Sequence, residues 1–454
     1  MHEAKEQQWD AIIVGAGLSG LCAARALSAK GATAIVLEAR DRVGGRTWSQ
    51  PIGKGIFDLG GQWLGAGQSR LAALARELNV QTYAQYNEGK KILEMDGSRS
   101  TYTGTIPKLA PWRLAELHLT LSRAEKMAKE IRLDNPMGSK NAEEYDARTI
   151  DDWMRGHVMS QAVRDIFRAA VRTIFGADPC DLSLLYFLYY ARSGGNLRNL
   201  IEIKNGAQEE RFVGGVQRIS IELANRLNPS VVFNAPARSI AQSEEGVLVR
   251  TDRGEFKGKR VIVAIPPALA GRIHYEPGLP VLRDQLTARF PMGATVKSYA
   301  LYEKAFWREE GLSGEAVCTK GPIATVFDAT THDGAQPALL CFIVGQPARE
   351  WSSRSVQERQ RAVIGTLTRL FGPKASNPIE YREQDWSTEI WTRGCPTSTM
   401  APGALTACAP ALRQACGRIH WAGTESAMVW TGYMEGAIEA GERAAGEVLA
   451  QLNG

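Results

Sequence analysis

DAIIVGAGLSGLCAARALSAKGATAIVLEARDRVGGRT, residues 10–47, is the stretch that decides the fold of this chain. An apolar run at 11–14 is followed by closely spaced glycines and by a small-residue helical pattern at 18–30 that ends at Gly31. A second apolar run, at 33–37, leads directly to Glu38. This order predicts a strand, a helix and a second, parallel strand, which together form one βαβ unit.

Three glycines in this unit, Gly15, Gly17 and Gly20, have the spacing that suits a bound dinucleotide. Gly15 would make the tight turn, Gly17 would let the backbone approach a pyrophosphate, and Gly20 would allow close packing of helix and strand. The helix N-terminus attracts phosphate charge, and Glu38 can accept the protons of both ribose hydroxyls. A glycine-rich turn without a ligand is the alternative for an isolated motif. Here the motif follows a strand, opens a helix and precedes a carboxylate, so we expect a dinucleotide.

The residues that follow the second strand carry a more specific signal. The string EARDRVGGRT contains Arg40, Arg42, Gly44, Gly45 and Arg46. It resembles the flavin-binding signature of the flavin-containing amine oxidase family, in its monoamine oxidase type with soluble, bacterial-like members. The resemblance covers nearly the whole chain and implies that FAD is the cofactor. It further implies that Arg40 is among the cofactor-binding residues and that Gly44, Gly45 and Arg46 lie against the FAD pyrophosphate.

The composition indicates a globular protein with a large core. At 454 residues, 44% of them hydrophobic, the chain is long enough for two or three domains. Its 54 basic and 49 acidic residues are mixed along the sequence and leave a net charge of +5, which is typical of an ordinary solvated surface rather than a nucleic-acid-binding one. Seven cysteines without a CxxC pair and six scattered histidines predict neither a disulfide framework nor a metal site.

No targeting or membrane segment is expected. Residues 1–10 carry charges of both signs and lack the apolar core of a signal peptide, and no run approaches the ~20 apolar residues of a membrane helix. The chain ends at Gly454, soon after its last predicted helix, where membrane-bound monoamine oxidases continue into an anchoring tail. We therefore expect a soluble, cytoplasmic protein without a membrane partner, and a homodimer is one assembly to test.

Hydrophobic periodicity divides the rest of the chain. Residues 71–205 are predicted to be mostly helical, and the apolar block LSLLYFLYY at 182–190 favours a buried helix over a cavity-lining one. Strands are predicted at 231–233, 247–251, 261–265, 295–302 and 339–344, and a helix at 356–371.

Together these patterns and the family resemblance predict an α/β fold with two domains, both discontinuous in sequence. The first is a Rossmann-type FAD-binding domain comprising residues 1–80, 205–290 and 385–454. The second is an α+β substrate-binding domain comprising residues 81–204 and 291–384.

Several further segments match family segments that contact the cofactor or the substrate. FDLGGQWLGAG, at 57–67, implies that Gly61, Gln62 and Trp63 lie beside the flavin. This segment lacks both the histidine that polyamine oxidases commonly place after the tryptophan and the Met-Arg pair of L-amino acid oxidases. In the segment NGAQEERFVGGV, at 205–216, Gln208 would line the substrate cavity. The resemblance also implies that Leu200 and Ile201 lie near the cavity entrance and that Ala237 lies near the adenine.

The C-terminal stretch, 418–450, matches the family closely. It predicts a short strand that ends at Gly423 and a helix that starts between 432 and 434. A helix N-terminus there would direct peptide N–H groups and the positive end of its dipole at the N1/C2 region of the reduced flavin. The resemblance therefore adds Gly423, Thr424 and Met434 to the cofactor-binding residues.

The resemblance assigns Lys297 and Tyr433 to catalysis. Lys297 lies in an alternating, strand-like segment, where an exposed lysine is the alternative. In the family, a lysine at this position hydrogen-bonds through a water to flavin N5 and assists the reaction with oxygen. Tyr433 matches one of two aromatic residues that flank the amine, whereas Pro396 stands at the other position. One missing aromatic wall opens space for bulkier or alicyclic amines.

Tryptophans and one cysteine complete the expected site. We expect Trp386 and Trp430 near the flavin or the cavity, and we assign Trp391 and Trp421 to the core. The segment WSTEIWTRGCPTSTMAPG, at 386–403, matches a family segment whose cysteine is bonded to the flavin 8α carbon. That resemblance implies covalent FAD on Cys395, and a free buried cysteine is the alternative.

The resemblance implies an FAD-dependent oxidase that converts amines to imines, and then to aldehydes or ketones plus ammonia, while O2 is reduced to H2O2. Primary arylalkyl or alicyclic amines are the expected substrates. Only one dinucleotide fingerprint is present, which argues against a second site for NADPH. The electrons taken from the substrate are therefore expected to pass to O2 or to a protein partner. A flavin-dependent desaturase or dehydrogenase, and a non-catalytic flavin-binding module, are the two alternatives.

Overall fold

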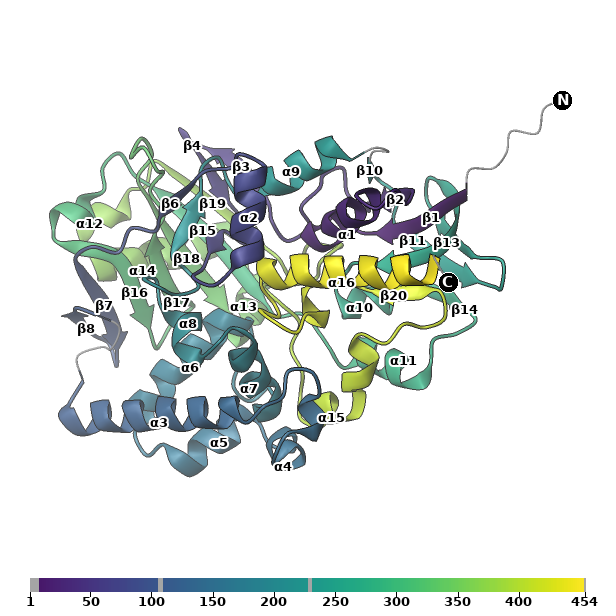
Figure 1. Ribbon diagram of the computed structural model, residues 1–454. Helices are drawn as coiled ribbons and strands as arrows, with labels where there is room; N and C mark the ends of the chain where they lie inside the picture. The colour runs from purple at the N-terminus through teal and green to yellow at the C-terminus, as the bar shows by residue number, and fades with distance from the viewer. Residues whose placement is uncertain (1–7, 105–108, 228–230, 453–454) are drawn as a thin grey trace.

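Two large β-sheets organise the chain, and each is assembled from segments that are far apart in the sequence (Figure 1). The computed structural model describes residues 8–104, 109–227 and 231–452. Helices from both ends of the chain cover the first sheet, and a group of helices from the middle of the chain lies below the second.

The first sheet has the strand order β10-β2-β1-β13-β12-β11-β14, and β20 pairs with β13. Strands β1, β2, β13 and β20 are parallel, so their carboxyl ends meet at one edge of the sheet. That edge is where open α/β sheets bind ligands. The bounds are β1 (Gln8–Val14), β2 (Ala34–Leu37), β10 (Val231–Val232), β11 (Ala237–Gln242), β12 (Val247–Thr251), β13 (Gly254–Val263), β14 (His274–Glu276) and β20 (Ile419–Trp421).

Helix α1 (Leu18–Ser28) follows β1 and packs against the C-terminal helix α16 (Met434–Leu452), so the two ends of the chain lie side by side (Figure 1). Small residues make this approach possible, because a Cβ on Gly441 would lie only 2.1 Å from the carbonyl oxygen of Ser19. Helices α2 (Ser69–Glu77), α9 (Gln217–Arg226), α10 (Pro267–Ala270) and α11 (Val281–Ala288) complete this half of the molecule.

The second sheet has the order β19-β15-β18-β17-β16-β7-β8 and is antiparallel except at the β16–β7 junction. One face packs on helix α14 (Val356–Phe371), where Val296 and Ile343 join Val363 and Leu367 in one apolar cluster. The helix begins with a capping box formed by Ser355 and Glu358. The bounds are β7 (Lys90–Met95), β8 (Ser98–Tyr102), β15 (Thr295–Leu301), β16 (Leu312–Cys318), β17 (Ile323–Asp328), β18 (Ala338–Val344) and β19 (Glu380–Asp385).

The helical group below this sheet surrounds α7 (Leu184–Ser193), which is buried along its whole length except at Arg192. The expected burial of this helix is therefore confirmed, but its preference over a cavity-lining role does not hold for Tyr190, which also lines a cavity. Its neighbours are α3 (Pro111–Lys129), α4 (Ala142–Asp146), α5 (Ile150–His157), α6 (Gln161–Phe175) and α8 (Leu197–Ile201). The remaining helices are α12 (Phe306–Glu309), α13 (Gln346–Ser352), α15 (Ala404–Cys408) and the short 3-10 segments Pro136–Gly138, Pro373–Ser376, Ala409–Leu412 and Thr424–Ser426.

The prediction of a mostly helical segment at 71–205 is wrong between residues 82 and 102, which form strands. Strands β7 and β8 are a hairpin that turns at Asp96 and Gly97, and both turn residues have positive φ angles, 53° and 75°. An Asp-Gly pair between alternating residues is a strong hairpin signal that was available in the sequence. Two small sheets also form, β3–β4 (Ser49–Ile52, Gly55–Asp58) and β5-β9-β6 (Trp63–Leu64, Glu210–Phe212, Thr82–Ala84).

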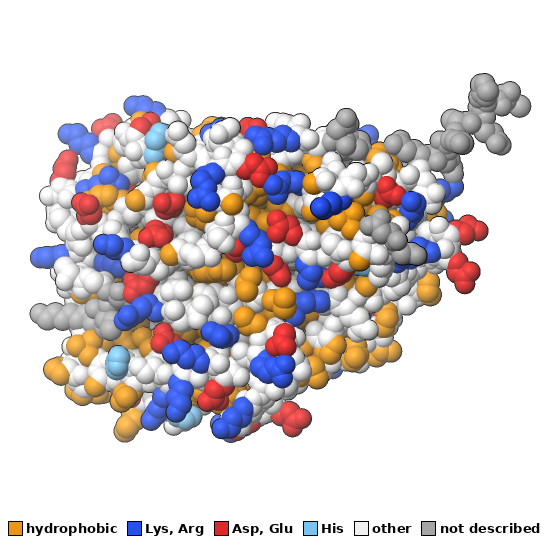
Figure 2. Space-filling view, in the orientation of Figure 1, with side chains coloured by type: hydrophobic (Ala, Val, Ile, Leu, Met, Phe, Trp, Pro, Cys, Tyr) orange, Lys and Arg blue, Asp and Glu red, His pale blue; other side chains and the backbone are white. Residues whose placement is uncertain are grey.

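Positive and negative side chains are interspersed over the face seen in Figure 2, as the mixed charge pattern of the sequence predicts. All seven cysteines are free thiols. Of the helices built from described residues, none combines the length and the apolar character needed to cross a lipid bilayer.

Candidate active site

One cavity of about 810 Å³ extends from the carboxyl edge of the first sheet to the cavity-facing side of the second. Its size is in the range of cofactor and ligand pockets. It brings together all but two of the residues that the sequence assigned to the site. These are Gly15, Gly17, Glu38, Arg40, Gly44, Gly45, Arg46, Gly61, Gln62, Trp63, Leu200, Ile201, Gln208, Ala237, Lys297, Trp386, Cys395, Pro396, Gly423, Thr424, Tyr433 and Met434.

The two predicted residues that do not line the cavity are Gly20 and Trp430. A Cβ on Gly20 would lie 1.9 Å from the carbonyl oxygen of Gly15, so this glycine allows α1 to pack against the turn. Trp430 is buried behind Tyr433, and their ring centroids are 5.0 Å apart in an edge-to-face arrangement. Both residues therefore support the site from outside its surface.

At the first-sheet end, the turn after β1 leaves the N-terminus of α1 open. Gly17 is the N-cap and has no side chain to bond the first-turn N–H groups, and a Cβ built on it would meet no protein atom within 4 Å. The N–H of Gly44 donates to the carbonyl oxygen of Ala16 (2.8 Å), which holds the second glycine pair beside this terminus. Such an uncapped helix end favours an anion.

Glu38 is fixed at the end of β2 by backbone donors. Its Oε2 accepts from the N–H of Ala16 (2.7 Å) and its Oε1 accepts from the N–H of Arg40 (3.0 Å). The Arg40 guanidinium reaches across the cavity edge to Glu389 and to the hydroxyl of Thr392. This network holds the carboxylate at the position that the dinucleotide motif predicts.

Arg46 forms a buried, bidentate ion pair with Glu425. Its Nη1 lies 2.6 Å from Glu425 Oε1 and its Nη2 lies 3.0 Å from Oε2, and Nη1 also donates to the carbonyl oxygen of Pro396 (2.9 Å). Burial alone would raise the pKa of Glu425, but the Arg46 charge and hydrogen bonds lower it overall. The pair ties the loop after β2 to the segment that carries Cys395.

Lys297 is buried, with only 2% of its surface exposed, so the alternative of an exposed strand lysine is wrong. Its Nζ donates to the carbonyl oxygens of Asp58 (2.5 Å) and Gly60 (2.7 Å) and to Gln62 Oε1 (2.6 Å). Burial lowers the pKa of Lys297 to about 7, while the negative charge of Asp58 acts in the opposite direction. The three oxygen acceptors match the three N–H donors of an ammonium group.

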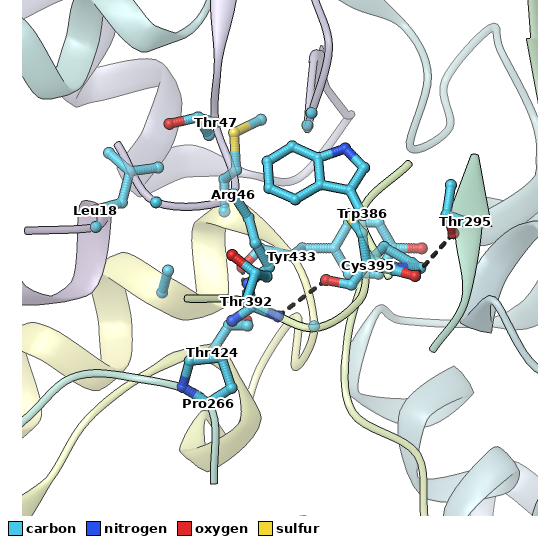
Figure 3. A pocket seen from close by; sticks show the side chains of 18 of the residues that line it. Leu18, Arg46, Thr47, Pro266, Thr295, Trp386, Thr392, Cys395, Thr424 and Tyr433 are labelled. Atoms are coloured by element: carbon cyan, nitrogen blue, oxygen red, sulfur yellow. Dashed lines mark hydrogen bonds between the residues drawn. The ribbon is translucent and has the colours of Figure 1, made fainter. Parts of the chain in front are cut away.

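Trp386 and Cys395 lie beside Lys297 and Arg46 in the cavity wall. Figure 3 shows Arg46, Trp386, Cys395 and Tyr433 converging on this pocket from segments far apart in the sequence. Trp386 Nε1 donates to the carbonyl oxygen of Leu59 (2.8 Å), and the carbonyl oxygen of Cys395 accepts from Thr295 Oγ1 (2.7 Å). Burial raises the pKa of the Cys395 thiol to about 11, although the charges of Arg46 and Lys297 lower it in part.

The aromatic wall of the cavity has a member that the sequence did not reveal. Tyr190, from α7, lies 5.8 Å from Tyr433 between ring centroids, and Pro396 also lines the cavity. Burial raises the pKa of both phenols, so they stay protonated at neutral pH. Tyr190 was hidden because its helix is apolar on every face, which gives no periodic signal for a cavity.

Other lining residues were also missed. Helix α6 contributes Ile166, Ala170, Thr173 and Ile174, and their spacing of four, seven and eight residues is a helical stripe. Trp391 lines the cavity and lies under the Arg238 guanidinium at 5.6 Å, so its assignment to the core is wrong. The second sheet contributes Lys91, Tyr102, Glu315, Val317, Thr325, Phe327 and Phe342.

The residues at the first-sheet end fit FAD. The helix N-terminus is open, and the room next to Gly17 belongs to the cavity itself. Buried polar atoms of the cavity residues that have no hydrogen-bond partner in the protein include Arg40 Nε, Gln62 Nε2 and Gln208 Oε1. Buried polar atoms normally have a partner, so such atoms around one cavity point to a polar ligand. Among the described residues, no group of histidine, cysteine, aspartate and glutamate could hold a metal ion.

Comparison with known proteins gives consistent results. Residues 18–449 match the family described as flavin containing amine oxidoreductase. The chain is 41% identical over 447 residues to the probable flavin-containing monoamine oxidase A of Dictyostelium discoideum, with 98% of each chain covered. It is 36% identical over 447 residues to the flavin-containing amine oxidase B of Sus scrofa, covering 97% of this chain and 86% of the relative.

Two solved structures are similar over nearly their whole length. Cyclohexylamine oxidase from Brevibacterium oxydans IH-35A has a TM-score of 0.95 at 32% identity, covering 99% of this chain and 100% of its own. A putrescine oxidase mutant from a redesign of cofactor binding, in which cysteine replaces an alanine, has a TM-score of 0.95 at 32% identity, covering 98% of this chain and 100% of its own.

These similarities confirm the expected α/β amine oxidase fold and the expected enzymatic activity on amines. They favour an amine oxidoreductase over a desaturase or a non-catalytic flavin-binding module, because the relatives are named as amine oxidases. The family is flavin-containing, which implies FAD. The chain belongs to the flavin-containing amine oxidoreductase family.

Proposed function

We propose that this enzyme oxidises primary arylalkyl or alicyclic amines and passes the electrons to O2, which gives H2O2. One observation carries the proposal: a single cavity joins a dinucleotide cradle to a largely apolar pocket that holds a buried lysine. In this proposal residues 1–80, 205–290 and 385–454 bind FAD, and residues 81–204 and 291–384 bind the amine.

FAD would be held mainly by backbone and by two carboxylate-centred networks. The open N-terminus of α1, with Gly17 and Gly45 beside it, would take the pyrophosphate, and Glu38 would accept from the ribose hydroxyls. The N-terminus of α16, at Tyr433 and Met434, would favour negative charge at the ring system. When bound, the flavin supplies the acceptor for the hydride that leaves the carbon next to the amine nitrogen.

The protein side of the reaction is to orient the amine, keep it neutral and exclude water. Tyr433 and Tyr190 provide an aromatic wall on one side, and Pro396 leaves more room than an aromatic residue would on the other. A neutral amine enters an apolar pocket more easily than a charged one, because burying an unpaired ammonium is costly. The released imine would then be hydrolysed by water outside the site.

Lys297 is proposed to assist the reaction of the reduced enzyme with O2. Its buried amino group is held by the carbonyl oxygens of Asp58 and Gly60 and by Gln62 Oε1, and Lys297 lines the same cavity as Trp386 and Cys395. A fixed positive charge stabilises negative charge as it develops on oxygen.

An amine panel tests the substrate class, with peroxide release as the readout and bleaching of the flavin by each amine under anaerobic conditions as the control. Cyclohexylamine and arylalkyl amines should be oxidised, while spermine and putrescine should be poor. The alicyclic part is supported by the structural similarity to a cyclohexylamine oxidase. A strong preference for polyamines, or activity confined to L-amino acids, would contradict the proposal.

We also propose that Cys395 carries FAD through a bond between its sulfur and the 8α carbon. The thiol lines the cavity near two cations, Arg46 and Lys297, which stabilise its thiolate. Overall, the thiol loses its hydrogen and the 8-methyl group loses one, and O2 takes both hydrogens with their electrons and becomes H2O2. A structurally similar putrescine oxidase was given a cysteine in a redesign of cofactor binding, which makes a cysteine near the cofactor worth testing here.

Acid precipitation decides between the two states of Cys395. A yellow pellet whose mass exceeds that of the polypeptide by one FAD is expected for the wild type, and a colourless pellet for Cys395→Ala. If all colour stays in the supernatant of the wild type, Cys395 is only a neighbour of the flavin.

A further inference from the structure

We propose that Lys91 and Glu315 together bind the end of the substrate opposite the oxidised amino group. They select a neutral hydrogen-bonding group at that end, such as a hydroxyl. This inference rests on the proposed function and narrows its substrate class. It concerns two charged residues that line the same cavity as Lys297 but lie on strands β7 and β16, toward the opposite edge of the second sheet.

The register of the strands in the second sheet shows how far Lys91 and Glu315 lie from Lys297. Lys297 on β15 is opposite Phe342 on β18, Phe342 is opposite Thr325 on β17, and Thr325 is opposite Val317 on β16. All four side chains line the cavity. Neighbouring strands are about 4.8 Å apart, so this row crosses about 14 Å. Glu315 precedes Val317 by two residues and lines the cavity at the same end.

The far end of the row carries a buried ion pair. Lys91 Nζ lies 2.8 Å from Glu315 Oε2, and the two side chains are only 12% and 13% exposed. They come from β7 and β16, which are parallel neighbours. Burial raises the pKa of Glu315, the charge of Lys91 lowers it in part, and the negative charge of Glu202 acts in the same direction as burial. Two opposite charges therefore meet in one wall of the cavity, with the side chain of Tyr102 also in that wall.

The space between the two polar ends is mainly apolar. Phe342 and Val317 line it from the sheet, and Ile166, Ala170 and Ile174 line it from α6. An alkyl or aryl chain can fill this space without losing hydrogen bonds, and its free end then lies against the ion pair. The substrate displaces the water that hydrates Lys91 and Glu315. The binding free energy therefore depends on whether the free end of the substrate replaces the hydrogen bonds of that water.

Four kinds of end group differ in this respect. A terminal ammonium is attracted by Glu315 but repelled by Lys91, and a terminal carboxylate meets the reverse. A terminal methyl displaces water from the ion pair and forms no hydrogen bond with either charge, and the loss of water is costly for buried charges. A hydroxyl donates to the carboxylate and accepts from the ammonium at the same time, so it satisfies both partners. The neutral pair should therefore prefer a hydroxyl.

The test uses four matched series of primary amines that end in methyl, hydroxyl, ammonium or carboxylate, with chains of about four to ten carbons that bracket the span. In the wild type the amino alcohols should show a length optimum, with kcat/KM about tenfold above the other three series, the effect of about one well-placed hydrogen bond. If Lys91 and Glu315 had only a structural role, substituting either of them would change kcat/KM of all four series by the same factor.

Variants separate the two members of the pair. Lys91→Met should shift the preference toward the diamines, and Glu315→Gln should shift it toward the amino acids, each by about tenfold, because one uncompensated charge remains. Lys90→Met removes an exposed neighbour on the same strand and should leave the ranking unchanged. If the single variants fold poorly, the double variant Lys91→Met with Glu315→Gln removes both charges and should favour the alkylamines.

The outcomes distinguish this inference from the proposed function. If neither these series nor cyclohexylamine and the arylalkyl amines bleach the flavin, the proposed function fails. If amines are oxidised but the four end groups rank equally in the wild type, or the ranking of the variants stays that of the wild type, the proposed function stands and the end-reading role of Lys91 and Glu315 is overturned.

Discussion

The two ends of the cavity are made of different parts of the polypeptide. At the first-sheet end, the wall is largely backbone: the open helix N-terminus after Gly17, the glycine pair beside it, and the start of α16. At the second-sheet end, the wall is made of side chains on separate strands and on α6, such as Phe342, Thr325 and Ile174. The first end offers fixed backbone N–H groups to a ligand, and the second end offers a surface whose shape is set by side chains.

This difference teaches where the site can change. A backbone wall depends on φ and ψ angles and on missing side chains, so most substitutions there alter the cradle itself. A side-chain wall can be altered one residue at a time while its strands stay in place. We therefore expect changes at the first end to affect folding and cofactor binding, and changes at the second end to affect substrate choice and rate.

The largest effect should follow the loss of the buried charge that supports the backbone wall. Glu425→Gln leaves Arg46 without its charged partner, and only 1% of the Glu425 side chain is exposed. We expect a loss of about 3 kcal/mol in the free energy of unfolding, measured by urea denaturation with bound FAD. Glu255→Gln, which breaks an exposed pair with Arg250, is the matched control and should cost less than about 1 kcal/mol.

This effect should also depend on pH. The pKa of Glu425 is lowered in the folded protein, so the ion pair contributes stability above the usual pKa of a free glutamate, 4.5, and loses it as the pH falls through the folded value. The gap between wild type and Glu425→Gln should therefore be constant near neutral pH and close only in acid. Equal costs for the two variants at pH 7 would mean that the buried pair does not support the first end.

A second effect should be confined to the cofactor. Gly17 has a φ angle of −73°, which alanine tolerates, and a Cβ there would meet no protein atom but would enter the cavity. We expect Gly17→Ala to weaken FAD binding about 100-fold, which corresponds to about 2.8 kcal/mol, and to leave the stability of the apoprotein unchanged. Fluorescence titration of apoprotein with FAD measures this affinity in a Cys395→Ala background, in which no covalent bond can form.

Gly156→Ala is the control for that variant. Gly156 lies within helix α5, a Cβ there also meets no protein atom within 4 Å, and the residue is not part of the cavity wall. This substitution should leave FAD affinity unchanged. Unaltered FAD affinity in Gly17→Ala would place the pyrophosphate elsewhere and remove the basis for a backbone cradle.

The same contrast explains what the sequence could predict. The βαβ unit is contiguous, so Gly15, Gly17, Gly20 and Glu38 are recognisable from their spacing, and of these all but Gly20 line the cavity. Lys91 and Glu315 are not recognisable together, because they meet only through the parallel pairing of β7 with β16, across more than two hundred residues. Each is an ordinary charged residue in its own segment.

Two further errors have local causes. The β7–β8 hairpin was missed although its Asp96–Gly97 turn is visible in the sequence. The cause is that residues 71–205 were treated as one mostly helical segment. Trp391 was assigned to the core because a tryptophan alone gives no sign of which side of it faces a cavity. Lys297 was placed correctly only through the family resemblance, since alternation in a strand predicts an exposed lysine.

The smallest of the three effects concerns the rate at the second end. Lys297 is an ammonium below pH 7 and becomes neutral as the pH rises through its pKa of about 7. A positive charge stabilises the negative charge that develops as O2 is reduced, so reoxidation should be faster on the acid side of this pKa. In Lys297→Met the rate should be about tenfold lower below pH 7 and independent of pH, and the two enzymes should converge at high pH.

Stopped-flow mixing of the reduced enzyme with O2 at several pH values measures these rates. Tyr299→Phe is the matched control, because Tyr299 also donates to the Asp58 carbonyl and to Gln62 but carries no charge at neutral pH. This variant should keep the pH profile of the wild type, even if its overall rate changes, because the ammonium remains. If Lys297→Met and the wild type have superimposable profiles, the buried charge has no part in the reaction with O2. Lys297 would then belong with Arg46 as a structural cation, tying β15 to the loop that ends at Gln62.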